Sequence, residues 1–166
     1  MKNNIVIPTP EQHEQMRQIA ERFYGTASHP DQIQINHDAE VKLRALHSHA
    51  VLCVIADHQP VSWIVVVPTQ KALARKFLDH AMTERALYDQ TLSQSIYDAL
   101  YLCSVFTLPA YRRKGYAADL LREVMKHIPL TKDALLFGWL YSKEGEALYR
   151  AMQKEYPAKV EVRQDA

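Results

Sequence analysis

The stretch of sequence that decides the fold covers Val105–Ala117 and reads VFTLPAYRRKGYA. Its first residues close an apolar run, Tyr97–Thr107, whose two faces are both largely apolar, as in a central strand covered on both sides. Pro109 ends that strand, and an amphipathic pattern then covers Gly115–Ile128. The stretch therefore predicts a buried strand, a short turn and a long helix.

The start of this predicted helix has the composition of an anion site. The first turn of a helix leaves about four backbone N–H groups unpaired at the positive end of the helix dipole, which suits a phosphate. Gly115 and Ala117 are small enough to let a ligand approach, and Arg112, Arg113 and Lys114 add positive charge beside them. Three solvated surface charges are the alternative interpretation. The buried strand before them and the small residues after them favour a phosphate site.

Outward from this stretch, the hydrophobic pattern predicts a mixed α/β sheet of about six strands flanked by helices. The predicted strands are Ile5–Ile7, Val51–Ala56, Val61–Val67, Tyr97–Thr107, Ala134–Tyr141 and Lys159–Arg163, the last at an edge. A first helix is predicted between the cap Thr9 and Gly25, and the others cover Asp38–His47, Gln70–Ala81, Glu84–Thr91, Gly115–Ile128 and Lys143–Lys154. Residues 69–95 thus form a helical insert between the third and fourth strands.

The composition indicates one globular domain over residues 1–166. With 48% hydrophobic and 23% charged residues, the chain is not intrinsically disordered, and its formal net charge of +1 argues against a nucleic-acid partner. No apolar run approaches the roughly 20 residues of a membrane helix, and the N-terminus predicts no signal peptide. Cys53 and Cys103 stand far apart in apolar runs, which predicts buried free thiols and a cytoplasmic protein.

Two motifs resemble the GNAT superfamily of acetyl-CoA-dependent N-acetyltransferases. The first, Arg112-x-x-Gly115-x-Ala117 after Pro109-x-Tyr111, resembles the pyrophosphate-binding signature that opens a helix in this superfamily. The second runs from Ser142 to Tyr149, where a small polar residue follows the fifth strand and a Leu-Tyr pair lies on the next helix. The predicted order of elements also suits the GNAT fold.

The resemblance implies an acetyl-CoA site and direct acyl transfer within residues 99–154. The fourth and fifth strands would splay apart and hold the pantetheine arm against backbone groups, while the helix start would hold the pyrophosphate. The residues implied at this donor site are Val105, Phe106, Thr107, Arg112, Arg113, Lys114, Gly115, Tyr116, Ala117 and Ser142. Tyr149 would protonate the leaving thiolate, since a phenol of pKa about 10 stays protonated at neutral pH. Its alternative role is that of a core aromatic.

Two departures from the superfamily pattern concern the acceptor. Members often carry Gly-Phe soon after the tyrosine, where this chain has Met152-Gln153-Lys154, and the insert Gln70–Thr91 is longer than the usual connection. Both lie where acceptor recognition is expected, so the resemblance implies no particular acceptor. We expect the insert to shape acceptor choice and to leave donor binding unchanged.

The general base is left unassigned by the sequence. The fourth strand contains no carboxylate inside it, so the alternatives are Asp98 at its start, Glu84 or His80 in the insert, and a water chain to solvent. Cys103 has no neighbouring sign of activation, and we expect a structural thiol there.

No metal site is expected, because His47-x-His49 is the only close histidine pair and lacks further ligands at metal spacing. The leading hypothesis is an N-acetyltransferase acting on the amine of a small molecule, an amino acid or a peptide. A catalytically silent acyl-CoA-binding regulatory domain and a polyanion binder are the alternatives. The oligomeric state is left open, with a homodimer as one alternative.

Overall fold

The computed structural model describes residues 4–24, 36–139, 143–156 and 159–164. Its centre is a six-stranded sheet with the strands in the order β1-β2-β3-β4-β5-β6. The strands are β1 Ile5–Val6, β2 Val51–Ala56, β3 Gln59–Thr69, β4 Tyr97–Thr107, β5 Leu130–Trp139 and β6 Val160–Arg163. Strands β1 to β4 pair antiparallel, whereas β4, β5 and β6 pair parallel, which confirms a mixed sheet with β6 at its edge.

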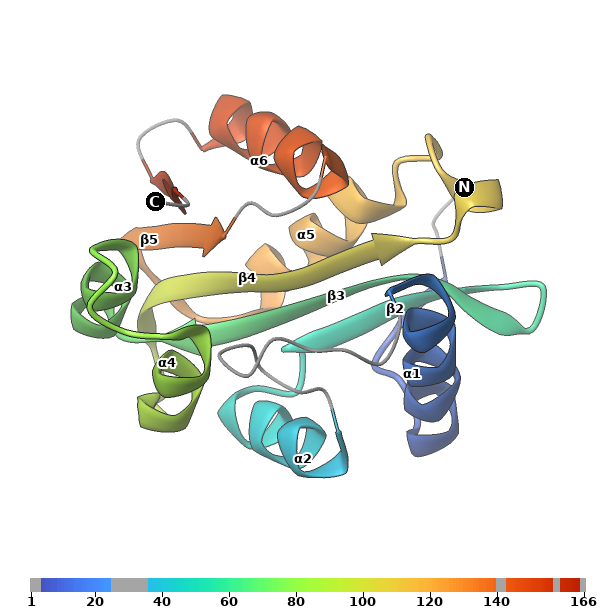
Figure 1. The fold of residues 1–166 in the computed structure, drawn as a ribbon, viewed down its shortest axis with the longest axis horizontal. Coiled ribbons are helices and arrows are strands. Elements are labelled where there is room, and N and C mark those ends of the chain that lie inside the picture. Colours follow the sequence, from blue (N-terminus) through green and yellow to red (C-terminus); the bar gives the residue numbers. More distant parts are fainter. Residues whose placement is uncertain (1–3, 25–35, 140–142, 157–158, 165–166) are drawn as a thin grey trace.

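Helices cover both faces of this sheet (Figure 1). They are α1 Pro10–Tyr24, α2 His37–Leu46, α3 Lys71–Leu78, α4 Glu84–Gln90, α5 Tyr116–His127 and α6 Lys143–Glu155, with a 3-10 turn, η1, at Pro109–Tyr111. In Figure 1, α1, α2 and α4 lie below the sheet, and α6 lies above it. The predicted order of strands and helices, including the insert of α3 and α4, is confirmed.

Strand β3 is longer than the predicted Val61–Val67 and contains two prolines. Pro60 pairs only with β2, because the β3–β4 ladder begins at Ser62, and Pro68 pairs only with β4, because the β2–β3 ladder ends at Val65. Each proline therefore sits where β3 has one neighbour, so its missing N–H breaks no second ladder. Proline thus marks the ends of the doubly paired segment of β3.

Local capping explains where two helices begin. The Thr9 N–H donates to Gln12 Oε1 at 2.9 Å and the Gln12 N–H donates to Thr9 Oγ1 at 3.2 Å, which is the predicted capping box of α1. Thr83 Oγ1 accepts from the Ala86 N–H at 3.0 Å and caps α4, also as predicted.

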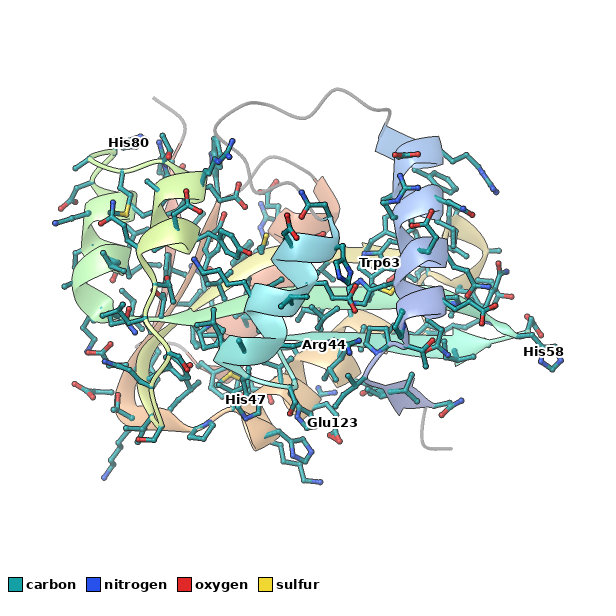
Figure 2. The ribbon with its side chains drawn as sticks, turned by 90° about the horizontal axis from the view of Figure 1, so that it is seen from below. Arg44, His47, His58, Trp63, His80 and Glu123 are labelled. Carbon is teal, nitrogen blue, oxygen red and sulfur yellow. The ribbon has the colours of Figure 1, made fainter. Side chains whose placement is uncertain are left out.

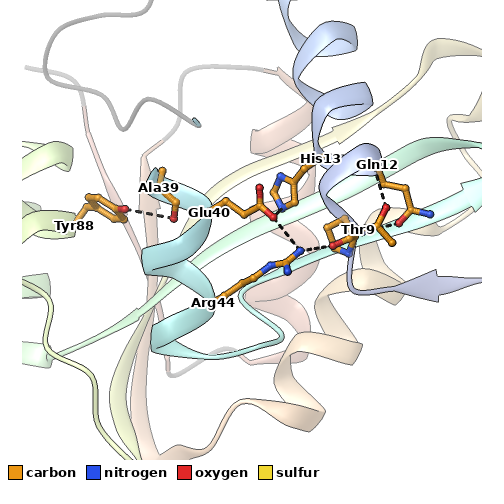
Figure 3. A network of polar contacts seen from close by, with 8 residues as sticks. Thr9, Gln12, His13, Ala39, Glu40, Arg44 and Tyr88 are labelled. Carbon is orange, nitrogen blue, oxygen red and sulfur yellow. Dashed lines mark hydrogen bonds and ion pairs between the residues drawn. The ribbon is translucent and has the colours of Figure 1, made fainter. Parts of the chain in front are cut away.

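A buried polar network joins α1 to α2 (Figure 3). Glu40 on α2 lies between His13 Nε2, at 3.6 Å, and Arg44 Nη2, at 3.0 Å. Arg44 also donates to the carbonyl of Pro8, just before α1. Burial is the main cause of the lowered pKa of His13. This network fixes α1 and α2, two of the helices that lie below the sheet in Figure 1.

The insert is anchored on β4, β5 and β6 by aromatic contacts. Phe77 of α3 is fully buried, and its ring centroid lies 5.2 Å from Tyr101 and 5.9 Å from Phe137. Arg163 of β6 covers the Phe77 ring at 4.6 Å and donates to the carbonyl of Met82 at 3.2 Å. The insert is therefore part of the core beside β4, β5 and β6, rather than a loop at the surface.

Candidate functional site

The donor side of the candidate site is the turn between β4 and α5. Gly115 caps α5 with φ 79° and ψ 12°, and a Cβ atom at this position would meet nothing within 4 Å. The space beside Gly115 is therefore open, and the unpaired N–H groups and the positive dipole end of α5 begin at this residue. A phosphate fits such a start without special side chains. The side chains from Arg112 to Lys114 beside it are exposed.

Side chains of the turn are held by their neighbours. Arg112 Nε donates to the carbonyl of Thr107, the last residue of β4, at 3.1 Å. The Tyr111 hydroxyl donates to Asp57, and Lys114 Nζ lies 5.1 Å from the centre of the Tyr111 ring. The hydrogen bond to Asp57 is the main cause of the raised pKa of Tyr111. These contacts keep the basic cluster beside the helix start.

Strands β4 and β5 pair over only part of their lengths. Their ladder ends at the pair Leu102 and Gly138, while β4 continues to Thr107. We call this point of separation the fork. Beyond it Val105–Thr107 pair with β3, and the described β4–β5 ladder does not extend to them. We expect the backbone of this segment to form strand-like hydrogen bonds to a ligand.

Side chains of Val105–Thr107 contribute little to that edge. Phe106 is buried, with its ring centroid 4.7 Å from Trp63 and 5.4 Å from Phe23. The Thr107 hydroxyl lies 2.8 Å from Ser62 Oγ on β3. These side chains are thus engaged within the protein, and the main-chain role of the segment stays a prediction.

Tyr149 reaches the fork from α6. Its hydroxyl donates to the carbonyl of Leu102 at 3.2 Å, and the residue is 5% exposed. A Cβ atom on Gly138 would lie 1.3 Å from this hydroxyl oxygen, so only glycine leaves room for the ring. The geometry thus brings a phenol to the last paired residues of β4 and β5, as a donor to a group held in the fork would require.

A groove of about 330 Å³ runs between α5 and α6, the helix that carries Tyr149. It is lined by Ala118, Leu121, Arg122, Leu148, Ala151, Met152, Lys154 and Glu155. Met152 and Lys154 stand where the superfamily often has Gly-Phe. The groove begins near the first turn of α5, next to the predicted pyrophosphate position.

On the other side of the fork, the insert brings Glu84 against β4. Glu84 is 2% exposed, and Cys103 Sγ donates to its Oε1 at 3.3 Å. Burial raises the pKa of this carboxyl from 4.5 to about 7, although Cys103, Tyr101 and Arg163 each oppose the rise. Cys103 occupies a bulge, because Val65 pairs with Ser104 and Val66 pairs with Leu102. A carboxylate with a near-neutral pKa therefore lies beside the irregular part of β4.

The other base alternatives have structural partners. Asp98 Oδ1 accepts from the Lys71 N–H at 2.6 Å and caps α3. His80 Nδ1 lies 3.2 Å from Arg163 Nε at the far end of the insert (Figure 2). Burial and the adjacent Glu84 carboxylate raise the pKa of Cys103 well above its ordinary value, so its thiol stays protonated. This agrees with a structural thiol. Glu84 and a water chain to solvent stay as alternatives for the base.

The comparison with protein families decides the assignment of this fold. The acetyltransferase (GNAT) family matches residues 13–131, which include β4, the turn and all of α5. The chain belongs to the GNAT acetyltransferase family. The match ends at the start of β5, so it does not include Tyr149.

Solved structures agree with this assignment. The aminoglycoside N-acetyltransferase AAC(6')-Iy, in complex with CoA, has a TM-score of 0.51 and 15% identity, covering 98% of this chain and 94% of that one. The ribosomal-protein-alanine N-acetyltransferase of Brucella melitensis biovar Abortus 2308 has a TM-score of 0.53 and 11% identity, with 92% and 90% covered. At these identities the likeness shows a shared GNAT fold. A search of curated protein sequences gives no match.

Most residues predicted for the GNAT donor site gather in the structure. Val105–Thr107, the turn from Arg112 to Lys114, and Gly115–Ala117 lie along one path from the fork to the start of α5. Ser142 falls outside the described residues. From the sequence, Glu84 was one of several alternatives for the general base. Thr83 did predict where α4 begins, but nothing in the sequence indicated that this helix would face Cys103.

The histidines form no metal centre in the described ranges. No group of three or more His, Cys, Asp or Glu side chains there is arranged to hold a metal ion. His49 stacks on His127 at 4.1 Å, and burial is the main cause of the lowered pKa of His47 and of His49. Figure 2 shows His47 near Glu123, far from His80 and His58. None of the described helices is long and apolar enough to cross a membrane.

Proposed function

We propose that this GNAT domain is an acetyl-CoA-dependent N-acetyltransferase, which transfers an acetyl group by direct attack to an amine of a small molecule, an amino acid or a peptide. The observation that carries the proposal is the fork. From the fork, where the Tyr149 hydroxyl meets Leu102, β4 continues past its described ladder with β5 to the turn and to the open space beside Gly115. A strand edge, an anion site and a phenol are the groups needed for a pantetheine arm, a pyrophosphate and a thiolate.

The donor fits residues that the structure describes. The cradle at Gly115 would receive the pyrophosphate, since no atom lies within 4 Å of the space a Cβ would take. The edge of Val105–Thr107 would pair with the amides of the pantetheine arm. Acetyl-CoA supplies the thioester whose carbonyl carbon the amine attacks.

Two further groups of this chain would act on the reacting atoms. A backbone N–H on the open edge of β4 would stabilise the developing oxyanion, since such a donor is already in place when charge appears. Tyr149 would give its proton to the departing sulfur, at the point where its hydroxyl now meets the Leu102 carbonyl.

The donor site is tested by a pair of variants at Gly115. Gly115→Glu places a bulky anion at the cradle, and Gly115→Gln has nearly the same size and the same strain at φ 79° without the charge. We expect Gly115→Glu to abolish acetyl-CoA binding in calorimetry and Gly115→Gln to weaken it less, with both variants folded by circular dichroism. Equal affinities for Gly115→Glu and the wild type would refute the phosphate site.

The reaction is tested by thiol release from acetyl-CoA with a panel of polyamines, amino acids and short peptides. Release that depends on one amine class supports an N-acetyltransferase and identifies its acceptor. Binding of acetyl-CoA without thiol release for any amine would favour the alternative, a catalytically silent acyl-CoA-binding regulatory domain.

A further inference from the structure

Glu84 is a buried carboxylate that the donor site does not use. It stands at the first position of α4, and its side chain turns toward β4 rather than toward solvent. Oε1 accepts from Cys103, Tyr101 also hydrogen-bonds the carboxyl, and Oε2 is buried. Burying a carboxylate is costly to the fold even with such partners, so its retention calls for another explanation than stability.

The groups around Glu84 come from two strands. Tyr101 and Cys103 face it from β4, and the Arg163 guanidinium of β6 acts on it electrostatically. Arg163 is held by the Phe77 and Trp139 rings, at 4.6 and 4.9 Å, and by the Met82 carbonyl. The strongest influence is burial, which opposes ionisation. The carboxyl is therefore poised to exchange a proton near neutral pH, where general bases are most effective.

Glu84 and Tyr149 approach adjacent residues of β4 from opposite faces of the sheet. Tyr149 donates to the Leu102 carbonyl from α6, and Glu84 accepts from the Cys103 thiol from α4. Figure 1 shows α6 above β4 and α4 below it. An amine that attacks a thioester held at the fork from the α4 side would meet the carboxylate, while the sulfur leaves toward the phenol.

We propose that Glu84 is the general base of the reaction, supplied by the helical insert, and that it takes the proton from the acceptor amine. This inference rests on the function proposed above. The neutral amine nitrogen attacks the carbonyl carbon, forming a C–N bond while the carbonyl electron pair moves to oxygen. The nitrogen proton then passes to Glu84 Oε2, the carbonyl re-forms, and the C–S bond breaks as Tyr149 protonates sulfur. The proton on Glu84 returns to Tyr149 through solvent.

The position of Glu84 gives the insert a second role. Strand β4 has no carboxylate within the segment at the fork, and the insert supplies one from outside the strand. Ser104 and Val105, next to the bulge, are half-buried, so the accessible edge of β4 begins one residue from the contact of Glu84. The acceptor would therefore lie along α4 and β4, and the same helix would contact it and deprotonate it.

The test compares Glu84→Gln with Glu40→Gln, a matched loss of the other buried glutamate. Glu40 is 8% exposed and belongs to the α1–α2 network, away from the fork. Thiol release is measured with acetyl-CoA and the best amine of the panel, from about pH 5.5 to about pH 9. We expect Glu84→Gln to lower kcat by about 10²–10⁴-fold and to remove the fall in rate below about pH 7, whereas Glu40→Gln keeps the wild-type profile.

A second measurement does not depend on turnover. In the wild type, the Glu84 carboxyl ¹³C resonance is assigned as the one that is absent from the spectrum of Glu84→Gln. This resonance should titrate near pH 7 and shift when the amine is added with a thioether analogue of acetyl-CoA. A resonance that ignores the amine, or a Glu84→Gln variant with wild-type kcat and pH profile, would overturn the assignment. Should Glu84→Gln fail to fold, Glu84→Asp replaces it, and an unchanged kcat there would refute the base.

The outcome also distinguishes a failure of this inference from a failure of the proposed function. If the wild type turns over and Glu84→Gln does so equally, only the base is wrong. If the wild type binds acetyl-CoA and no amine releases thiol, the proposed reaction fails and the base proposal falls with it.

Discussion

The two sides of the fork use different parts of the protein, main chain on one side and side chains on the other. On the α5 side the candidate site consists of main chain, with the segment Val105–Thr107 beyond the described β4–β5 ladder and the helix start at Gly115. On the α4 side it consists of side chains, with Glu84 enclosed by Cys103, Tyr101 and Arg163. The first side carries exposed basic side chains, whereas the carboxyl on the second side is buried.

This difference decides what a sequence reveals. A main-chain site needs glycine, small residues and a helix start, and these follow one another along the chain. A side-chain site needs residues that the fold brings together, and Glu84 and Cys103 are 19 positions apart. The following predictions test whether the two sides are as separate in function as they are in construction.

The largest effect is expected for Tyr149→Phe, which keeps the ring and removes the hydroxyl. Turnover should fall by about 10²–10⁴-fold, the usual contribution of a positioned acid. Acetyl-CoA affinity should barely change, because the proton is needed in the transition state and not in the bound ground state. Steady-state kinetics and calorimetry measure the two quantities. Full turnover on a proven acceptor would make Tyr149 a packing residue.

Gly138→Ala is an independent check on this prediction. Its Cβ would lie 1.3 Å from the Tyr149 hydroxyl, so the ring must move away from Leu102. Turnover should then fall as in Tyr149→Phe, with an added loss of about 1–3 kcal/mol in the free energy of unfolding from overpacking. Retained turnover would show that the hydroxyl need not stay at the fork.

The next effect concerns stability and pH at Glu84. The pKa of Glu84 in the folded state is about 7, which lies above the ordinary 4.5. The contribution of Glu84 to the stability of the fold is therefore fully present below about pH 4.5 and is lost as the pH rises through 7. The ionised carboxylate thus lowers the free energy of unfolding by up to about 3 kcal/mol at pH 8. Glu84→Gln cannot ionise. Its stability relative to the wild type should therefore increase from about pH 5 to about pH 8 in denaturant titrations.

A stability difference that stays constant with pH would contradict the buried carboxylate. Higher stability together with lower turnover would be the trade-off expected of a group kept for chemistry rather than for packing. Glu40→Gln serves as the control, because Glu40 is compensated by Arg44 at 3.0 Å.

The smallest effect is expected for Arg112→Ala. The side chain is exposed and donates to the Thr107 carbonyl at the end of β4. A charged hydrogen bond to phosphate is worth about 1.5–3 kcal/mol, so acetyl-CoA affinity should fall by roughly 10- to 150-fold. This loss should shrink at high salt, because exposed charges are screened. An effect independent of salt would instead assign Arg112 to holding the turn.

Much of the fold was predictable because its signals are local. The capping box at Thr9, the cap at Thr83 and the two apolar faces of β4 each indicated the element that the structure contains. The prolines of β3 were harder to interpret, since their tolerance depends on which neighbouring strand is present.

The sequence by itself determined the order of the elements and placed the basic turn and Gly115 directly before a helix, where a phosphate site is predicted. Only the tertiary structure decided where β4 and β5 separate, that Gly138 makes room for Tyr149, and that α4 turns Glu84 toward Cys103. The physical reason is the range of the forces involved. Caps, turns and hydrophobic periodicity act within a few residues, whereas burial, and with it the pKa of a carboxyl, depends on segments that meet only when the chain has folded.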